Sequence, residues 1–104
     1  IVAYGTTTRS AIQAAEDYRN QLGIKVGVFE LQTVWPFADD IIEEVCGKAK
    51  AVIVAEMNMG QIVHEVRRVA PNRDKVFLSN RANNQLISPN DIKAALKMIQ
   101  GKGV

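Results

Sequence analysis

The sequence predicts a three-layer α/β/α sandwich built on an open, mainly parallel sheet. Four short apolar runs alternate with four stretches that have helical spacing, along all 104 residues. The run 51–55 is apolar throughout, as a strand covered by helices on both faces requires. Strict β-α alternation favours parallel strands joined by right-handed crossovers.

The first half of the chain carries two β-α units. Strands are expected at 1–4 and 25–31, and a hydroxyl-rich turn at 5–10 opens the first helix, which Gly23 can end in a left-handed conformation. Asp39 and Asp40 lie in the first turn of the second helix, where the helix dipole favours negative charge. Helical spacing predicts two buried stripes, made of Ala11, Ile12, Ala15, Tyr18 and Leu22, and of Ile41, Ile42, Val45 and Cys46.

The second half repeats the pattern, with strands expected at 51–55 and about 75–79. The helix after the third strand should bury Ile62, Val63, Val66 and Val69 and end before Pro71. The last helix has the clearest start signal. Ser88 is the expected N-cap, with Pro89 in the first helical position and Asp91 three residues after the cap. Ile87 and Ile92 could form a hydrophobic staple across this start.

The first and third strands are the most apolar and should be central, which gives the strand order 2-1-3-4. Residues 1–104 then form a single domain. The chain begins inside a strand-like run without an initiator Met, so we expect it to be a fragment of a longer polypeptide.

Composition excludes several classes of protein. The net charge of +2 is too small for a dedicated nucleic-acid binder. No apolar run approaches the ~20 residues of a membrane span. The single cysteine, Cys46, rules out a disulfide within the chain and suits a reducing compartment, so we expect a cytoplasmic protein.

Ligands of open parallel sheets bind beyond the carboxyl ends of the strands, where the strand order reverses. Here that point lies between the first and third strands, and the loops 5–10 and 56–61 face it. Backbone N–H groups and hydroxyls of the first loop could hold a phosphate or carboxylate, which makes Thr6, Thr7, Thr8 and Arg9 candidate ligands. Alternatively, one threonine caps the helix and the others are solvated.

The loop after the third strand gives the candidates Glu56, Asn58, Gly60 and Gln61. It could form the wall of a site that another domain completes, or be an ordinary turn in which Asn58 or Gln61 caps the next helix. In the loop 33–37, Trp35 is a candidate interface anchor if it is exposed.

No catalytic or metal-binding constellation emerges from the sequence. His64 has no second ligand at metal spacing, so we interpret it as a solvated side chain. Cys46 lies on an apolar helix face, and iron–sulfur clusters typically need four cysteines. Two other proteins of this architecture fit less well. A response-regulator receiver needs acidic residues where this chain has Tyr4 and Gly5, and a flavodoxin matches only the hydroxyl-rich turn.

Four ordered stretches together resemble the transketolase C-terminal-like domain of 2-oxoacid:ferredoxin oxidoreductase alpha subunits. They are VAYGTTTRSA at 2–11, GVFELQTVWPF at 27–37, VIVAEMNMGQ at 52–61, and Ser88-Pro89 with the final helix. The Trp-Pro-Phe and Glu-Met-Asn-x-Gly-Gln segments are the most specific. The resemblance covers nearly the whole chain.

The resemblance implies a parent enzyme that oxidatively decarboxylates a 2-oxoacid on thiamine diphosphate and Mg²⁺. Such an enzyme reduces ferredoxin through an iron–sulfur cluster and transfers the acyl group to coenzyme A. The domain would help to assemble the alpha subunit with the beta subunit in an oligomer, would bind no cofactor alone and would be inactive in isolation. The family also carries an extra antiparallel edge strand. The alternative is an independent small-ligand, nucleotide-binding or oligomerisation module with a flavodoxin-like fold.

Overall fold

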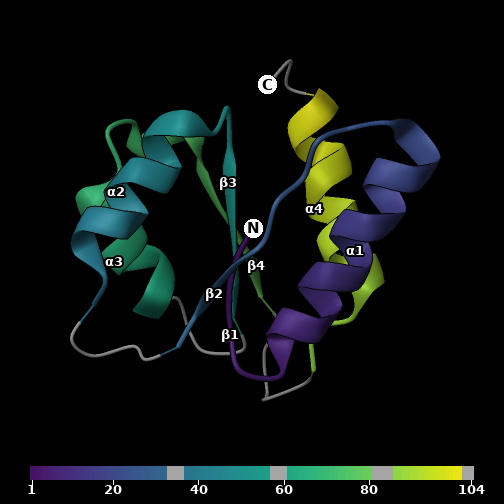
Figure 1. Cartoon of the computed structure of the whole chain (residues 1–104), viewed down its shortest axis with the longest axis horizontal. Coiled ribbons are helices and arrows are strands. Elements are labelled where there is room, and N and C mark those ends of the chain that lie inside the picture. The colour runs from purple at the N-terminus through teal and green to yellow at the C-terminus, as the bar shows by residue number, and fades with distance from the viewer. Residues whose placement is uncertain (33–36, 57–60, 81–85, 102–104) are drawn as a thin grey trace.

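The computed structural model describes residues 1–32, 37–56, 61–80 and 86–101. Strands and helices alternate along the chain (Figure 1), with one short 3₁₀ helix before the last strand. Their bounds are β1 Val2–Tyr4, α1 Thr7–Leu22, β2 Phe29–Leu31, α2 Asp39–Lys48, β3 Val52–Glu56, α3 Gln61–Val69, η1 Arg73–Lys75, β4 Val76–Asn80 and α4 Pro89–Gly101.

The four strands form one parallel sheet in the order β2-β1-β3-β4, which confirms the predicted order. Figure 1 shows the sheet nearly edge-on, with α2 and α3 on one face and α1 and α4 on the other. The chain after β1 therefore leaves toward one face and the chain after β3 toward the opposite face. The strand order reverses between these two strands, as the sequence predicts.

Each face of the sheet has its own apolar core. The α2/α3 face is lined by branched side chains of both central strands, including Val2, Val52 and Val54. The α1/α4 face is packed mainly with alanines, among them Ala3, Ala11, Ala14 and Ala55. Small side chains let a helix approach the sheet closely, which explains why α1 needs little apolar volume there.

Two predicted helix stripes are partly wrong. Ile12 and Leu22 of α1 and Ile41 of α2 are exposed by 44%, 58% and 51%, although each continues an apolar pattern. In α1 the buried stripe is made of alanines together with Tyr18, and in α2 Ile42 is the fully buried apolar residue. The helical period was right, but the rotation of each helix about its axis was not fixed by the apolar residues alone.

The second strand is shorter than predicted. Residues 25–28 form no strand, and β2 starts at Phe29, which pairs with Val2. A strand needs a hydrogen-bonded neighbour, and β1 pairs with β2 only over Val2–Tyr4. The last bond of this ladder joins the amino group of Ile1 to the carbonyl of Gly27, at 2.8 Å.

The predicted start of α4 is confirmed in detail. The backbone N–H of Ser88 donates to the Asp91 carboxylate at 2.8 Å, and the Asp91 N–H donates to the Ser88 hydroxyl at 3.2 Å. This reciprocal pair is a capping box, with Asp in place of the more usual Glu. Ile87 and Ile92 are both buried in the same core cluster, as the predicted hydrophobic staple requires.

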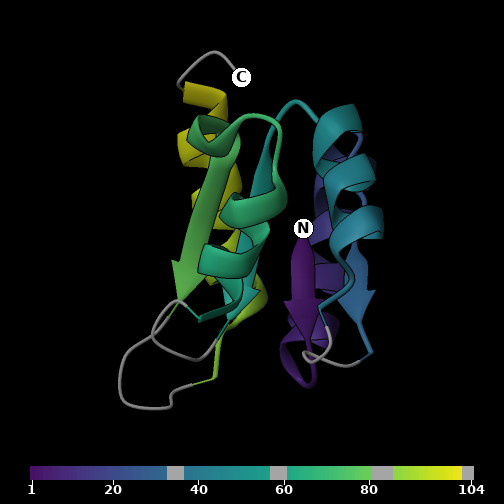
Figure 2. The ribbon, with the colours of Figure 1, turned by 90° about the vertical axis from the view of Figure 1, so that its left-hand side faces the viewer.

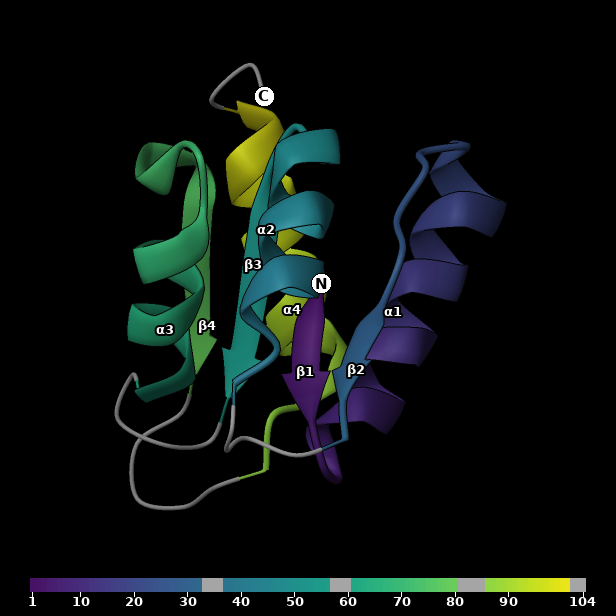
Figure 3. The same cartoon turned by 60° about the vertical axis from the view of Figure 1, so that its left-hand side comes forward.

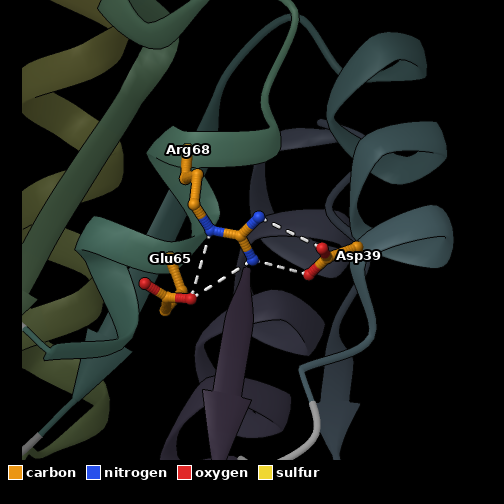
Figure 4. A network of polar contacts seen from close by, with 3 residues as sticks. All are labelled: Asp39, Glu65 and Arg68. Carbon is orange, nitrogen blue, oxygen red and sulfur yellow. Dashed lines mark hydrogen bonds and ion pairs between the residues drawn. The ribbon is translucent and has the colours of Figure 1, made fainter.

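An ion-pair network joins the two helices of the other face (Figure 4). The Arg68 guanidinium of α3 donates to both oxygens of Asp39 at the start of α2, at 2.7 and 3.1 Å. Glu65 accepts from the same guanidinium at 3.2 Å. Within the described part of the chain, no helix has the length and apolarity needed to cross a membrane.

Candidate functional site

The turn after β1 lies at the carboxyl edge of the sheet, at the lower end of Figure 3. Gly5 takes a φ of 65°, a left-handed conformation that glycine adopts at little cost. The N–H groups of Thr8 and Arg9 then donate to the carbonyls of Gly5 and Thr6, and α1 begins. Ser10 donates its hydroxyl to the carbonyl of Ile87 at 2.7 Å, which fixes this turn against the segment that precedes α4.

A cavity of about 730 Å³ opens beside this turn. It is lined by Gly5, Thr6, Thr7, Arg9, Ser10, Glu30, Leu86 and Ile87. One cation and one anion, Arg9 and Glu30, therefore face a space that also offers hydroxyls and the 70%-exposed side chain of Leu86. Such a mixed lining suits a polar contact with another polypeptide at least as well as it suits a simple anion.

The three threonines differ in accessibility. Thr6 is exposed, whereas Thr7 and Thr8 are buried. Thr6 occupies the N-cap position of α1 but makes no side-chain capping bond, so the predicted alternative of a capping threonine is wrong at that residue. The Thr8 hydroxyl is the one buried side-chain oxygen or nitrogen in the described residues that lacks a hydrogen-bond partner.

Glu56 has a structural role that the sequence did not reveal. Its side chain is 3% exposed at the end of β3, and its two carboxylate oxygens accept from the backbone N–H groups of Ile62 and Val63, at 3.0 and 2.8 Å. These are orphan donors in the first turn of α3, where the helix dipole also favours a negative charge. The carboxylate of Glu56 therefore satisfies two N–H groups at this helix start.

The remaining candidates are placed as follows. Gln61 is the first residue of α3 and is exposed, so its amide is free to contact a partner surface. Neither it nor Glu56 lines the cavity beside the threonine turn. Asn58, Gly60 and Trp35 lie outside the described residues.

The described residues hold no group of three or more His, Cys, Asp or Glu side chains that could bind a metal ion. His64 is exposed on α3. Cys46 is half-buried beside the α2/α3 core, and burial raises the pKa of its thiol, which disfavours the reactive thiolate. With a single cysteine and no such cluster of ligands, the described residues fit neither an iron–sulfur cluster nor a Mg²⁺ site.

Comparison with known proteins identifies the family. Residues 1–92 match the pyruvate:ferredoxin oxidoreductase core domain II. The chain belongs to this family. It is 38% identical over 95 residues to the 2-oxoglutarate synthase subunit KorA of Methanocaldococcus jannaschii, an alignment that covers 91% of the chain and 25% of that subunit.

Two further similarities agree with this assignment. The ketoisovalerate oxidoreductase subunit VorB of Methanothermobacter thermautotrophicus is 35% identical over 101 residues, covering 97% of the chain and 28% of that subunit. The fold matches the 2-oxoglutarate:ferredoxin oxidoreductase of Magnetococcus marinus with a TM-score of 0.81 at 21% identity, over 93% of this chain and 17% of that one. The chain thus spans about a quarter of the length of its curated relatives.

Proposed function

We propose that this domain belongs to the alpha subunit of a 2-oxoacid:ferredoxin oxidoreductase, where it stabilises the subunit assembly and forms a wall near the active site. The match of residues 1–92 to a core domain of such enzymes carries the proposal. The relatives named above are subunits of 2-oxoacid oxidoreductases with two different substrates, so the choice of 2-oxoacid is left to other parts of the enzyme.

The carboxyl edge of the sheet is the surface that would face the rest of the enzyme. It presents Thr6 and Arg9 on one loop and Gln61 at the start of α3, on either side of the switch point. The buried carboxylate of Glu56 acts indirectly, because it fixes the start of α3 and so the direction of Gln61. Asn58 and Gly60 belong to the same proposed wall, and Trp35 is proposed as an anchor for a neighbouring domain.

The cofactors of the proposed enzyme are thiamine diphosphate, Mg²⁺, an iron–sulfur cluster and coenzyme A, held mainly by other domains and the beta subunit. The Magnetococcus marinus enzyme was solved with coenzyme A and succinyl-CoA bound, which supports the coenzyme A assignment for the proposed complex. In this scheme ferredoxin is the electron acceptor, and a cytoplasmic location follows from the need for reduced carriers.

The decisive assay is 2-oxoacid-dependent ferredoxin reduction by the complete alpha–beta complex. Arg9→Gln and Gln61→Ala, each made in the full alpha subunit, should lower kcat/KM by about 10-fold, the equivalent of ~1.4 kcal/mol of lost transition-state stabilisation. Arg73→Gln is the matched control, because Arg73 is exposed in η1 at the opposite end of the sheet. It should leave the rate unchanged.

The same variants separate the wall from a module that only holds subunits together. If the carboxyl edge serves assembly alone, Arg9→Gln and Gln61→Ala will shift subunit dissociation in sedimentation experiments while the assembled complex keeps its full kcat. Wild-type kcat/KM and wild-type assembly in both variants would contradict the proposal at this surface.

A further inference from the structure

The amino end of α1 lacks the acidic group that the other described α-helices have at theirs. Asp39 and Asp40 lie in the first turn of α2, and Asp91 lies in that of α4. Glu56 accepts from the first N–H groups of α3. In α1 the first turn holds no acidic residue, and Thr6 makes no side-chain capping bond. The positive end of this 16-residue helix dipole is therefore uncompensated within the described residues.

Two backbone donors at this helix start are unpaired. The N–H groups of Thr8 and Arg9 donate to the carbonyls of Gly5 and Thr6, whereas those of Thr6 and Thr7 have no acceptor in the part of the chain that the structure describes. Helix starts leave such donors for a side chain, water or ligand to satisfy. Figure 2 shows that the turn after β1 and the segment leading into α4 both lie at the end toward which the strand arrows point.

Thr7 is an independent sign that a ligand binds here. Its side chain is 3% exposed and lines the cavity of about 730 Å³ beside the turn. The Thr7 hydroxyl has no hydrogen-bond partner among the described residues, yet it is not shielded from solvent as the Thr8 hydroxyl is. The small exposed part of Thr7 therefore includes its oxygen, which faces the cavity. Such a hydroxyl can donate to an acceptor that enters the cavity.

The charges of the cavity favour a single carboxylate over a phosphate. Arg9 is exposed and forms no ion pair with a described residue. Glu30 lines the same cavity, and its carboxylate accepts from the Gln32 amide at 3.1 Å. The lining thus carries one positive and one negative charge. A phosphate, with a charge of about −2, would meet one cation and the repulsion of Glu30. A carboxylate next to Arg9 forms one charge-assisted pair.

Exposed apolar side chains beside the cavity favour a carboxylate that belongs to a polypeptide. Leu86 lines the cavity and is 70% exposed, and Tyr4, directly before the turn, is 43% exposed. A free small anion would leave both in water, whereas a protein surface would cover them.

We propose that the cavity receives an Asp or Glu side chain of the polypeptide that covers this surface in the assembled enzyme. This carboxylate caps α1 from outside the domain, as Glu56 caps α3 from within it. It accepts from the N–H groups of Thr6 and Thr7, from the Thr7 hydroxyl and from the Arg9 guanidinium. The inference rests on the proposed function and specifies one contact of the proposed wall.

A zero-length cross-link tests for this carboxylate in the complete alpha–beta complex. Thr6→Lys, made with Glu30→Gln in the full alpha subunit, places an amine at the cavity and removes the carboxylate already there. A water-soluble carbodiimide joins an amine to a carboxylate in contact with it, with loss of water. We expect the introduced lysine to be linked to an Asp or Glu outside residues 1–104, as located by peptide mass spectrometry.

The matched control is Gln21→Lys in the same Glu30→Gln background. Gln21 is exposed at the far end of the same helix, so its variant should give at least ~10-fold less cross-linked product. Equal yields from the two lysines, or no link from either to a residue outside 1–104, would overturn the proposal.

Thr7 provides a second readout that does not introduce a charge. Thr7→Val removes the hydroxyl and Thr7→Ser keeps it. In the chain alone the two variants should have similar Tm values, since the hydroxyl has no partner there. In the complete complex, amide exchange over residues 6–9 should be about 10-fold faster in the valine variant than in the serine variant, because a hydrogen bond to a charged group is lost. Equal exchange in the complex would contradict the proposed contact.

These outcomes distinguish the carboxylate contact from the proposed function. If Arg9→Gln lowers kcat/KM but the introduced lysine links to nothing outside residues 1–104, the wall stands and the carboxylate contact is wrong. Inorganic phosphate tests for a free anion. If it shifts the amide resonances of residues 6–9 of the chain with a Kd below about 1 mM, the site binds a small anion, which also contradicts the proposal.

Discussion

Glu56 has a role in the fold that its position in the sequence did not reveal. The sequence marked it because a carboxylate follows an apolar strand at the switch point of the sheet. The structure shows the carboxylate turned inward to the first N–H groups of α3 rather than outward to a ligand. The acceptor lies six and seven residues before its donors, so no local capping pattern could have signalled it.

Removing this carboxylate should destabilise the domain substantially. Glu56→Ala leaves two buried backbone donors unpaired, at a cost of about 1–3 kcal/mol in the free energy of unfolding. Urea unfolding of the isolated chain measures this directly. Glu43→Ala removes an exposed carboxylate of α2 and should change the same free energy by less than ~0.5 kcal/mol. Equal effects of the two substitutions would refute the capping role.

Removing the hydroxyl of Thr8, in contrast to removing the Glu56 carboxylate, should not destabilise the domain. Its buried hydroxyl has no partner in the described residues, so Thr8→Val replaces an unsatisfied polar atom with a methyl group of similar size. We expect the free energy of unfolding to stay constant or to rise by up to about 1 kcal/mol. A loss of more than ~1 kcal/mol in thermal or urea unfolding would mean that the hydroxyl is bonded in the folded protein.

A substitution at Gly5 tests the conformation of the turn that borders the candidate site. A Cβ at Gly5 meets no atom within 4 Å, so Gly5→Ala should be destabilising only through its positive φ, by about 1–2 kcal/mol. Gly27→Ala is the matched control, because that glycine has equal space and no positive φ. Calorimetric Tm values should fall for the first variant and stay within ~2 °C of wild type for the second.

At the scale of elements, the Arg68–Asp39 pair binds α2 to α3 (Figure 4). The hydrogen bonds from Arg68 lower the pKa of Asp39 below its ordinary value of 3.8. The unfolded chain therefore binds this proton more readily than the folded protein. The stabilisation is fully present above about pH 4 and is lost as the pH falls through the lowered pKa.

Arg68→Gln should flatten the acid side of the stability profile. Between pH 5 and pH 2 the variant should lose less stability than the wild type, as measured by thermal unfolding in low salt. The pair is half-exposed, so added salt should shrink the difference. Arg19→Gln changes an exposed residue of α1 and should reproduce the wild-type profile. Identical profiles for all three proteins would contradict a stabilising role of the Arg68–Asp39 pair.

Elements with local signals were predicted well, and elements that depend on a neighbour were not. The start of α4 follows from Ser88, Pro89 and Asp91, whose contacts lie within three residues of one another. The extent of β2 depends instead on how far β1 reaches beside it, which the composition of residues 25–28 cannot reveal. The prediction that Ile12 and Ile41 are buried was wrong for the same reason, since packing between elements decides which face of a helix is buried.

At the scale of the whole molecule, strict alternation and the apolar ranking of the strands were enough to predict the sheet order and its switch point. The cavity was not predictable, because it is formed by segments from distant parts of the chain. The threonine-turn cavity joins the turn after β1, the start of α1, β2 and the segment before α4, whereas the sequence analysis had paired that turn with the loop after β3. The site residues predicted at that loop remain predictions, and the Gln61→Ala variant described above tests them.

In the proposed function, the domain is a necessary part of a larger enzyme rather than a catalyst in itself. The most direct measurement is 2-oxoacid-dependent ferredoxin reduction, with thiamine diphosphate, Mg²⁺ and coenzyme A supplied, by three samples. These are the chain alone, the complete alpha–beta complex, and a complex whose alpha subunit lacks residues 1–104. We predict turnover by the complete complex and none by the other two. Full activity from the complex that lacks this domain would contradict the central claim.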